Sequence, residues 1–361
     1  MGIRGLPSTY SGYETFAEAI GSALVERGHE VLVYCRSALY QQKLPAYRGM
    51  QLIYQPSLES KEFSTLSHTW FCMADVLRRQ TDVILVCNVG NGLHLIVPRL
   101  AGRKTAINVD GLEWKRPKWP RLGQLYFRFA ARMACLLADR IICDAAAMTH
   151  VYKHDFGVDA ATIAYGADTA ISTRPDVVRQ YGLEPARYFL VLARMIPDNN
   201  ADLIVDAFSN VQTTMKLAIV GDANYKSVFV TNLRQTRDTR VLFLGHVSDK
   251  DHLRELGCNA YAHVHGHEFG GTNPALLSAL GCGECVLALD TPFNREVLAG
   301  DYGILFRKDR ADLTQKMQGV VDQPDVRDRY ASRARSRIEA AYTWQHVTDQ
   351  YEMLLRELAG K

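Results

Sequence analysis

The sequence lacks several features that would each assign it to a particular class of protein. It has no run approaching the roughly 20 apolar residues of a membrane-spanning helix, and no signal peptide is recognisable at its start. Its 42 basic and 39 acidic residues leave a formal net charge of only +3, which is too small to indicate nucleic-acid binding. No strand is followed by a GxGxxG motif with an acidic partner further on, which argues against a nicotinamide-dependent oxidoreductase.

The cysteines also form no disulfide framework. The eight of them are scattered, mostly within apolar runs such as 82–87 and 139–143. This usage is typical of buried thiols in a reducing compartment, so we expect a cytoplasmic protein. Cys282 and Cys285 form a lone C-x-x-C without a second pair, and we expect buried thiols rather than metal ligands there.

The sequence does contain a repeated alternation of strand and helix patterns. At 361 residues the chain is too long for one ordinary core, and its length suggests about two domains. Amphipathic helical stretches separate apolar runs that predict strands at 30–35, 82–87, 104–110, 139–144, 188–194, 215–221, 240–245, 260–266 and 285–290. We therefore expect an α/β protein with two doubly wound domains, which meet in the polar, turn-rich stretch 166–186.

The first residues do not fit this alternation. A doubly wound domain normally opens with a strand that leads into its first loop, whereas residues 2–14 already have the composition of that loop. We expect the first strand to be truncated. The N-terminal sheet would then lack part of a central strand.

Residues 262–289, AHVHGHEFGGTNPALLSALGCGECVLAL, predict a buried strand, a glycine turn and a helix. Gly270 and Gly271 allow a ligand to approach the backbone, Asn273 is suited to the N-cap, and Pro274 suits the first helical position. The amide groups and positive dipole end of such a helix bind anions, typically phosphate. A helix cap without any ligand would use the same residues, so the motif alone leaves both interpretations open.

Three histidines precede this turn. His263, His265 and His267 alternate along the predicted strand, so their side chains should share one face. With Glu268 they could form a zinc site, although spacing alone is weak evidence for one. We expect neither a metal nor a cofactor.

Six motifs in chain order resemble one family: GIRGLPSTYSGYETFAEAI, NVDGLEWKRPKW, YGAD, VLARMIPDNN, GHV and HGHEFGGTNPALLSALGCGE. Together they are similar to the retaining GT-B glycosyltransferases of the GT4 type, and in particular to the bacterial rhamnosyltransferase-like branch of surface polysaccharide synthesis. The resemblance implies two Rossmann-like domains that face each other across a cleft, with the nucleotide-sugar donor mainly on the second domain. It implies domains at 1–168 and 169–342, and a C-terminal helix, 343–361, that crosses back onto the first.

The resemblance also implies how the donor diphosphate is held. Arg194 would neutralise it, while the lysine usual five residues later is Asn199 here; Arg4 would supply part of the missing charge. A second glutamate usual in the helix is replaced by Ser278, whose hydroxyl makes a weaker bond to a ribose. The backbone contacts would come from Gly270, Gly271, Thr272 and Asn273. Because of the two replacements, a non-catalytic nucleotide-sugar or glycan-binding relative remains the alternative.

The remaining expected contacts also follow from the resemblance. Ser11 and Gly12 would lie beside the diphosphate, and His267 and Glu268 would contact the sugar. Asp110 would orient the acceptor hydroxyl, although a turn residue at a strand end explains it almost as well. The nucleotide base would be met by Gly245, His246 and Val247. The departing phosphate can take the acceptor proton, so the expected catalytic residues, Arg194, Glu268 and Asp110, act mainly by positioning and charge.

Basic and aromatic residues are mixed in 114–137, WKRPKWPRLGQLYFRFAARMACLL. Such a mixture suits peripheral contact with an anionic membrane, as a lipid-linked acceptor at the inner membrane face would require. An ordinary amphipathic helix with a solvated basic face explains it equally well. The expected partners are thus a nucleotide-sugar donor, a lipid-linked or oligosaccharide acceptor and a membrane surface, but no nucleic acid.

Overall fold

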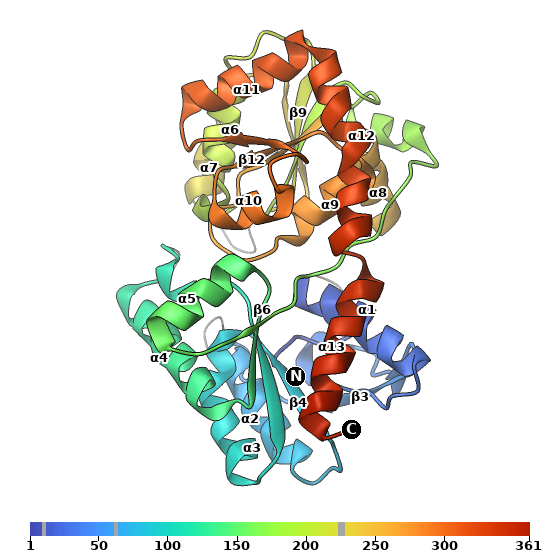
Figure 1. Cartoon of the computed structure of the whole chain (residues 1–361). Helices are drawn as coiled ribbons and strands as arrows, with labels where there is room; N and C mark the ends of the chain where they lie inside the picture. The colour runs from blue at the N-terminus through green and yellow to red at the C-terminus, as the bar shows by residue number, and fades with distance from the viewer. Residues whose placement is uncertain (9–11, 61–63, 118, 223–227) are drawn as a thin grey trace. The chain divides into compact units, whose positions relative to one another are not determined.

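The structure, a computed structural model, describes residues 1–8, 12–60, 64–117, 119–222 and 228–361. The chain divides into two compact units (Figure 1): Met1–Gly166 together with Trp344–Lys361, and Ala167–Thr343. The expected breaks followed residues 168 and 342, and the observed ones follow Gly166 and Thr343. No helix in the described ranges is both long and apolar enough to cross a membrane.

The C-terminal unit is built on one parallel sheet in the order β10-β9-β8-β11-β12-β13. Numbered along the unit, this order is 3-2-1-4-5-6, which is the order of a Rossmann fold. The strands are apolar in sequence because helices cover both faces of such a sheet. Their bounds are β8 Tyr188–Leu192, β9 Lys216–Val220, β10 Val241–Gly245, β11 Ala262–His265, β12 Val286–Leu289 and β13 Ile304–Phe306.

Several helices of this unit begin directly after a side chain that caps them. Four of them follow a side chain that accepts a hydrogen bond from an amide two or three residues on, which satisfies a donor that the helix itself leaves unpaired: Asp249, Asn273, Thr291 and Asp309. The helices are α6 Ala201–Phe208, α7 Val228–Leu233, α8 Lys250–Cys258, α9 Pro274–Cys282, α10 Pro292–Leu298, α11 Arg310–Asp322 and α12 Pro324–Ala341.

The N-terminal unit contains two sheets instead of one. The first has three strands in the order β1-β3-β2 and the second has four parallel strands in the order β4-β5-β6-β7. The strands are β1 Leu32–Arg36, β2 Ala46–Tyr47, β3 Met50–Gln55, β4 Val83–Cys87, β5 Lys104–Val109, β6 Arg140–Cys143 and β7 Ala161–Thr162. The longer helices are α1 Gly12–Glu26, α2 Ser64–Val76, α3 Ile96–Leu100, α4 Arg121–Leu137 and α5 Ala146–Phe156.

Residues 1–4 lie against both sheets. The amino group of Met1 donates to the carbonyl of Leu85 at 2.8 Å, and the amide of Cys87 donates to the carbonyl of Met1 at 2.9 Å. On the other side, the amide of Arg36 donates to the carbonyl of Arg4 at 2.8 Å. In the described part of the chain no strand precedes α1. Residues 1–4 instead form hydrogen bonds to β1 on one side and to β4 on the other.

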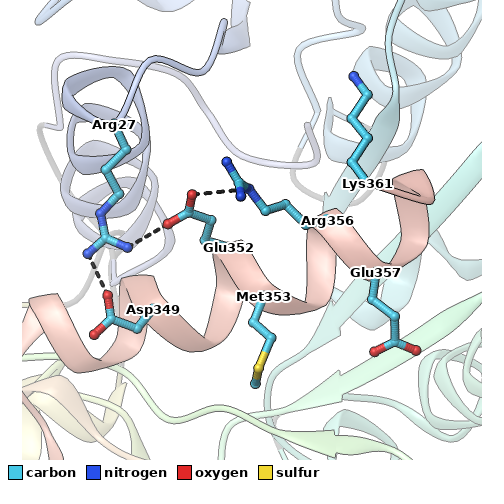
Figure 2. A pocket seen from close by; sticks show the side chains of 7 residues that line it. All are labelled: Arg27, Asp349, Glu352, Met353, Arg356, Glu357 and Lys361. Carbon is cyan, nitrogen blue, oxygen red and sulfur yellow. Dashed lines mark hydrogen bonds and ion pairs between the residues drawn. The ribbon is translucent and has the colours of Figure 1, made fainter.

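The last helix, α13 Trp344–Ala359, packs on the N-terminal unit. Tyr351 is fully buried against Phe16 of α1, with ring centroids 5.0 Å apart, and its hydroxyl is 2.6 Å from the side-chain amide of Asn108. At the surface, Figure 2 shows Arg27, which follows α1, between Asp349 and Glu352; the ion-pair distances are 2.6 and 2.7 Å. The return of the C-terminal helix to the first unit is therefore an observed feature of the fold.

Candidate active site

The order of the strands in the C-terminal unit selects the place for a ligand. β8 and β11 are neighbours, but the chain continues from them toward opposite edges of the sheet. In doubly wound folds, ligands bind outside the carboxyl ends of the two strands at such a switch point. Arg194 follows β8, and the loop 266–273 follows β11, so the sequence motifs for the donor meet at this point.

The glycine turn has the predicted geometry. Gly270 has φ +138°, a backbone conformation that favours glycine. The side-chain oxygen of Asn273 accepts from the amide of Ala275 at 2.9 Å, and Pro274 opens α9. Asn273 is thus confirmed as the N-cap. A nine-residue helix of this kind directs its first amides and its positive dipole end toward the switch point.

The two loops at the switch point are joined by hydrogen bonds. The amide of Glu268 donates to the carbonyl of Asp198 at 3.1 Å, and the side chain of Asn200 donates to the carbonyl of Gly266 at 2.8 Å. A Cβ on Gly266 would lie 2.4 Å from the carbonyl oxygen of Asn199, so only glycine allows this approach. Asn200 itself has φ +52°, a conformation that asparagine tolerates better than most residues.

Arg194 and Asn199 lie together but in different environments. Arg194 is exposed at the end of β8, whereas Asn199 is 4% exposed and its side-chain amide donates to the carbonyl of Arg194 at 2.7 Å. The side chain of Asn199 therefore fixes the loop by a hydrogen bond, whereas a lysine at this position would supply a positive charge. Ser278 is exposed on α9, one turn into the helix.

Glu268 forms an ion pair with a lysine that no sequence motif singled out. Lys308 follows β13, and its ammonium lies 2.5 Å from the Glu268 carboxylate; Asn200 donates to the same oxygen at 3.4 Å. The Glu268 side chain remains 28% exposed. Lys308 is far from Glu268 in the sequence. The two residues meet because they follow β13 and β11, which end at the same edge of the parallel sheet.

The histidines share one face, as predicted. The rings of His263 and His265 stack with centroids 6.0 Å apart, and those of His265 and His267 with centroids 4.4 Å apart. Burial, reinforced by the neighbouring imidazoles, holds the pKa of His265 well below its usual value, so this ring is neutral. His263 lies 3.5 Å from Glu284, whose pKa burial raises despite that histidine.

Stacked rings place their nitrogen atoms side by side and do not converge on one point. Among the described residues, no group of three or more histidine, cysteine or acidic side chains could hold a metal ion. Cys282 and Cys285 are buried free thiols, as the sequence predicted.

The segment expected to meet the base lies further along the same edge of the sheet. Gly245 ends β10 with φ +70°, and its carbonyl accepts from the amide of Gly221 at 2.8 Å. His246 is exposed and Val247 is half-buried. β10 is two strands from β8, a separation of roughly 10 Å at ordinary strand spacing, which suits a nucleotide that extends from a diphosphate near Arg194.

The candidates in the N-terminal unit form a separate group. Asp110 follows β5, and Tyr165 donates to its carboxylate at 3.4 Å. Val109 and Cys143 are register partners, so Asp110 and the buried Asp144 lie next to each other at the carboxyl ends of β5 and β6. Burial, together with the charge of Asp110, holds the pKa of Tyr165 well above its usual value. Asp144 is a polar neighbour that the sequence motifs did not single out.

Two acidic residues of this unit, Glu14 and Glu113, make contacts that stabilise their own loops. Glu14 is 2% exposed and accepts from the amide of Arg4 at 2.7 Å, which fixes the loop that precedes α1. Glu113 pairs with Arg116 at 3.1 Å and accepts from the indole of Trp119 at 2.6 Å. Gly12 begins α1, and Ser11 lies outside the described residues.

Two family models match parts of the chain. Residues 202–353 match a family described as glycosyl transferase-like, and residues 72–168 match a domain of unknown function, DUF1972. A curated relative is the N-acetylgalactosamine-N,N'-diacetylbacillosaminyl-diphospho-undecaprenol 4-alpha-N-acetylgalactosaminyltransferase of Campylobacter jejuni, 23% identical over 174 residues. That alignment covers 47% of this chain and 47% of the relative, so the chain spans about half the length of the curated relative it matches.

Solved structures resemble nearly the whole chain. Anabaena HepE in complex with UDP-glucose is similar with a TM-score of 0.79 at 17% identity, covering 97% of each chain. Sucrose-phosphate synthase from Thermosynechococcus elongatus is similar with a TM-score of 0.78 at 17% identity, covering 96% of this chain and 94% of that one. The chain therefore has the GT-B fold, and the residues that match the glycosyl transferase-like family include the glycine turn.

Proposed function

We propose that this protein transfers a sugar from a nucleotide-diphosphate donor to a lipid-linked or oligosaccharide acceptor in cell-surface polysaccharide synthesis. One observation carries the proposal: Arg194, the glycine turn and the N-terminus of α9 meet at the switch point of a Rossmann sheet. A cation and a helix N-terminus at this position are suited to a diphosphate. The C. jejuni relative is named for a diphospho-undecaprenol acceptor, and HepE was solved with UDP-glucose.

In the proposed reaction, the bond between the sugar C1 and the diphosphate oxygen breaks and a bond from C1 to the acceptor oxygen forms. Arg194 and the amides of residues 270–273 stabilise the charge that develops on the leaving diphosphate. The departing phosphate oxygen takes the acceptor proton on the same face of the sugar, which gives retention. Asp110 orients the acceptor, Glu268 and His267 contact the sugar, and no metal or cofactor takes part.

The donor is the part of the proposal that is simplest to test. The resemblance to rhamnosyltransferase-like proteins supports dTDP-rhamnose, whereas the relatives are named for N-acetylgalactosamine and UDP-glucose. We would compare thermal unfolding with UDP-, dTDP- and GDP-sugars. A ligand at 100 times its Kd stabilises the folded state by about 2.7 kcal/mol, so the donor should raise the melting temperature clearly. No shift with any nucleotide sugar would contradict the proposal.

Retention is tested on the product. Incubation with the identified donor and a lipid-linked or oligosaccharide acceptor should give a product whose anomeric configuration, read from NMR couplings, equals that of the donor. An inverted product would exclude the same-face mechanism but leave the transferase assignment intact.

A second candidate is a non-catalytic nucleotide-sugar-binding protein. It is favoured by Asn199, whose amide is committed to the carbonyl of Arg194, and by the hydroxyl of Ser278 in place of a carboxylate. Saturable donor binding without transfer or hydrolysis over many hours would favour this candidate.

A further inference from the structure

Helix α4 lies at the outside of the N-terminal unit (Figure 1) and has several exposed apolar side chains. Leu122, Leu125, Phe129 and Leu136 are 81%, 64%, 50% and 64% exposed. Their spacing of three, four and seven residues puts them on one face of the helix. Soluble surfaces seldom gather large apolar side chains in this way without a binding partner.

The same helix is basic and contains no acidic residue. Its sequence, RLGQLYFRFAARMACLL, includes Arg121, Arg128 and Arg132, and all three are exposed beside the apolar stripe. An apolar face bordered by arginines is complementary to a surface with an apolar interior and negative charges at its outer boundary. A bilayer with anionic head groups has this character.

The opposite face of α4 is fixed, so the stripe cannot turn inward. Ala130, Ala131 and Ala134 are fully buried against the segment 89–95. A Cβ on Gly92 would lie 2.1 Å from the carbonyl oxygen of Ala130, and the hydroxyl of Tyr126 donates to the carbonyl of Gly90 at 2.8 Å. Close backbone contact with the segment 89–95 therefore fixes the orientation of the helix.

The aromatic residues predicted for a membrane contact have other roles. Trp114 is buried, with its ring edge-on to those of Tyr152 and Phe156 at 5.9 and 5.7 Å. Trp119 stacks on Phe127 at 4.9 Å and donates to Glu113. The structure therefore moves the expected contact from these aromatic residues to the leucines, Phe129 and arginines of α4.

From these observations we infer that the outward face of α4 docks on an anionic lipid bilayer, with Leu122, Leu125, Phe129 and Leu136 inserted and the three arginines at the level of the phosphates. A protein groove would need acidic residues around its rim to match the same helix, and a second copy of α4 would bring arginines against arginines. The inference does not depend on the transfer reaction, since it concerns attachment alone.

The test is flotation of the full chain with vesicles of phosphatidylglycerol and phosphatidylcholine, and with vesicles of phosphatidylcholine alone. The wild type should float with the anionic vesicles at low salt and dissociate as salt rises. Leu125→Gln/Phe129→Gln should lower the partition coefficient at least about tenfold, because apolar burial is lost. Arg128→Ala/Arg132→Ala should lower it by about fivefold for each arginine.

Matched controls use equally exposed residues elsewhere. Ile171→Gln/Met353→Gln removes apolar side chains that are 71% and 69% exposed, and Arg329→Ala/Arg333→Ala removes two exposed arginines of α12. Both should bind vesicles like the wild type. Circular dichroism and melting curves would verify that every variant is folded.

Three results would overturn the inference. The wild type could fail to bind anionic vesicles at low salt, the control variants could lose binding as much as the α4 variants, or α4 could instead mediate self-association. Sedimentation of the wild type and of Leu125→Gln/Phe129→Gln without lipid identifies the last case. None of these results bears on donor binding, which the thermal unfolding experiment measures separately.

Discussion

At the scale of single residues, Arg194 is the exposed cation at the end of β8, and Asn199 stands where the resembled family usually has a lysine. Asn199 donates to the carbonyl of Arg194 and is almost fully buried, while Arg194 itself is exposed. A buried amide fixes the loop but carries no charge to place against a phosphate. In the proposed reaction, the side-chain charge at this loop therefore comes from Arg194.

We accordingly expect Arg194→Ala to lower kcat about 100-fold or more, because a group that stabilises developing charge is lost. Arg194→Lys should recover part of the activity, and Arg179→Ala, at an exposed arginine of the same unit, should leave it unchanged. Steady-state kinetics with the identified donor would measure this. Full turnover by Arg194→Ala would exclude the residue from the mechanism.

Glu255 gives a residue-scale prediction about stability. Its side chain is fully buried in α8 and accepts from the hydroxyl of Ser172 at 2.6 Å and from the amides of Thr173 and Arg174 at 2.9 and 3.1 Å. Burial disfavours the charged form, but these hydrogen bonds outweigh it and lower the pKa of Glu255 to about 2 from 4.5.

Because the folded pKa is depressed, the carboxylate stabilises the fold above about pH 4.5, and this contribution is lost as the pH falls toward 2. Glu255→Gln should lower the free energy of unfolding by about 2 kcal/mol at pH 7, with a smaller difference from the wild type at pH 3. Denaturant unfolding at several pH values measures this. Glu339→Gln, at an exposed position of α12, is the control, and a difference that is constant with pH would contradict the assignment.

At the scale of secondary-structure elements, α13 is held on the N-terminal unit by a row of buried side chains that includes Tyr351, and by a set of surface ion pairs. Tyr351 packs on Phe16 and bonds Asn108, whereas Arg27 pairs with Asp349 and Glu352 at the surface (Figure 2). Buried aromatic side chains stabilise a fold far more than exposed ion pairs do. We therefore rank Tyr351 above Arg27 in the attachment of α13.

Three substitutions test this ranking by chemical denaturation. Tyr351→Ala should lower the free energy of unfolding by about 3–5 kcal/mol, since it leaves a cavity beneath the helix. Tyr351→Phe should cost only about 1 kcal/mol, for the lost hydrogen bond to Asn108. Arg27→Ala should cost less than about 1 kcal/mol. An Arg27→Ala loss as large as that of Tyr351→Ala would reverse the ranking.

At the scale of the whole molecule, the chain has two units, and one of them contains most of the expected donor contacts. Residues 167–343 contain the six-stranded sheet, the glycine turn and Arg194. A ligand that binds the folded form of one unit stabilises that unit by mass action. Arg4 and Gly12, two further expected donor contacts, belong to the N-terminal unit.

Hydrogen exchange should therefore show that UDP, or the nucleotide of the identified donor, protects amides mainly within 167–343, with the largest effect at 266–277. Amides of β4 and β5 should exchange at unchanged rates. Equal protection of both units by the nucleotide alone would contradict a donor site that lies mainly on the C-terminal unit. Arg194→Ala, which retains the glycine turn, should weaken the protection without changing where it occurs.

Most of the secondary structure could be predicted from the sequence because it depends on local pattern. The nine expected strands all form within a few residues of their predicted bounds, and Asn273 caps α9 as its sequence indicates. Some elements were missed, among them the strands β3 and β13 and the helix α5. A strand such as β13 has only three residues, so pattern alone cannot separate it from a loop.

The sequence by itself determined that this is a two-domain α/β protein with a glycine turn before a capped helix, since apolar periodicity, glycine and caps act over a few residues. Only the tertiary structure decided which distant groups meet: Lys308 at Glu268, and Asp144 beside Asp110. It also decided which face of α4 is exposed. These contacts depend on the order of the strands and on the packing of the helices, which bring together residues far apart in the chain. A local sequence pattern does not contain that information.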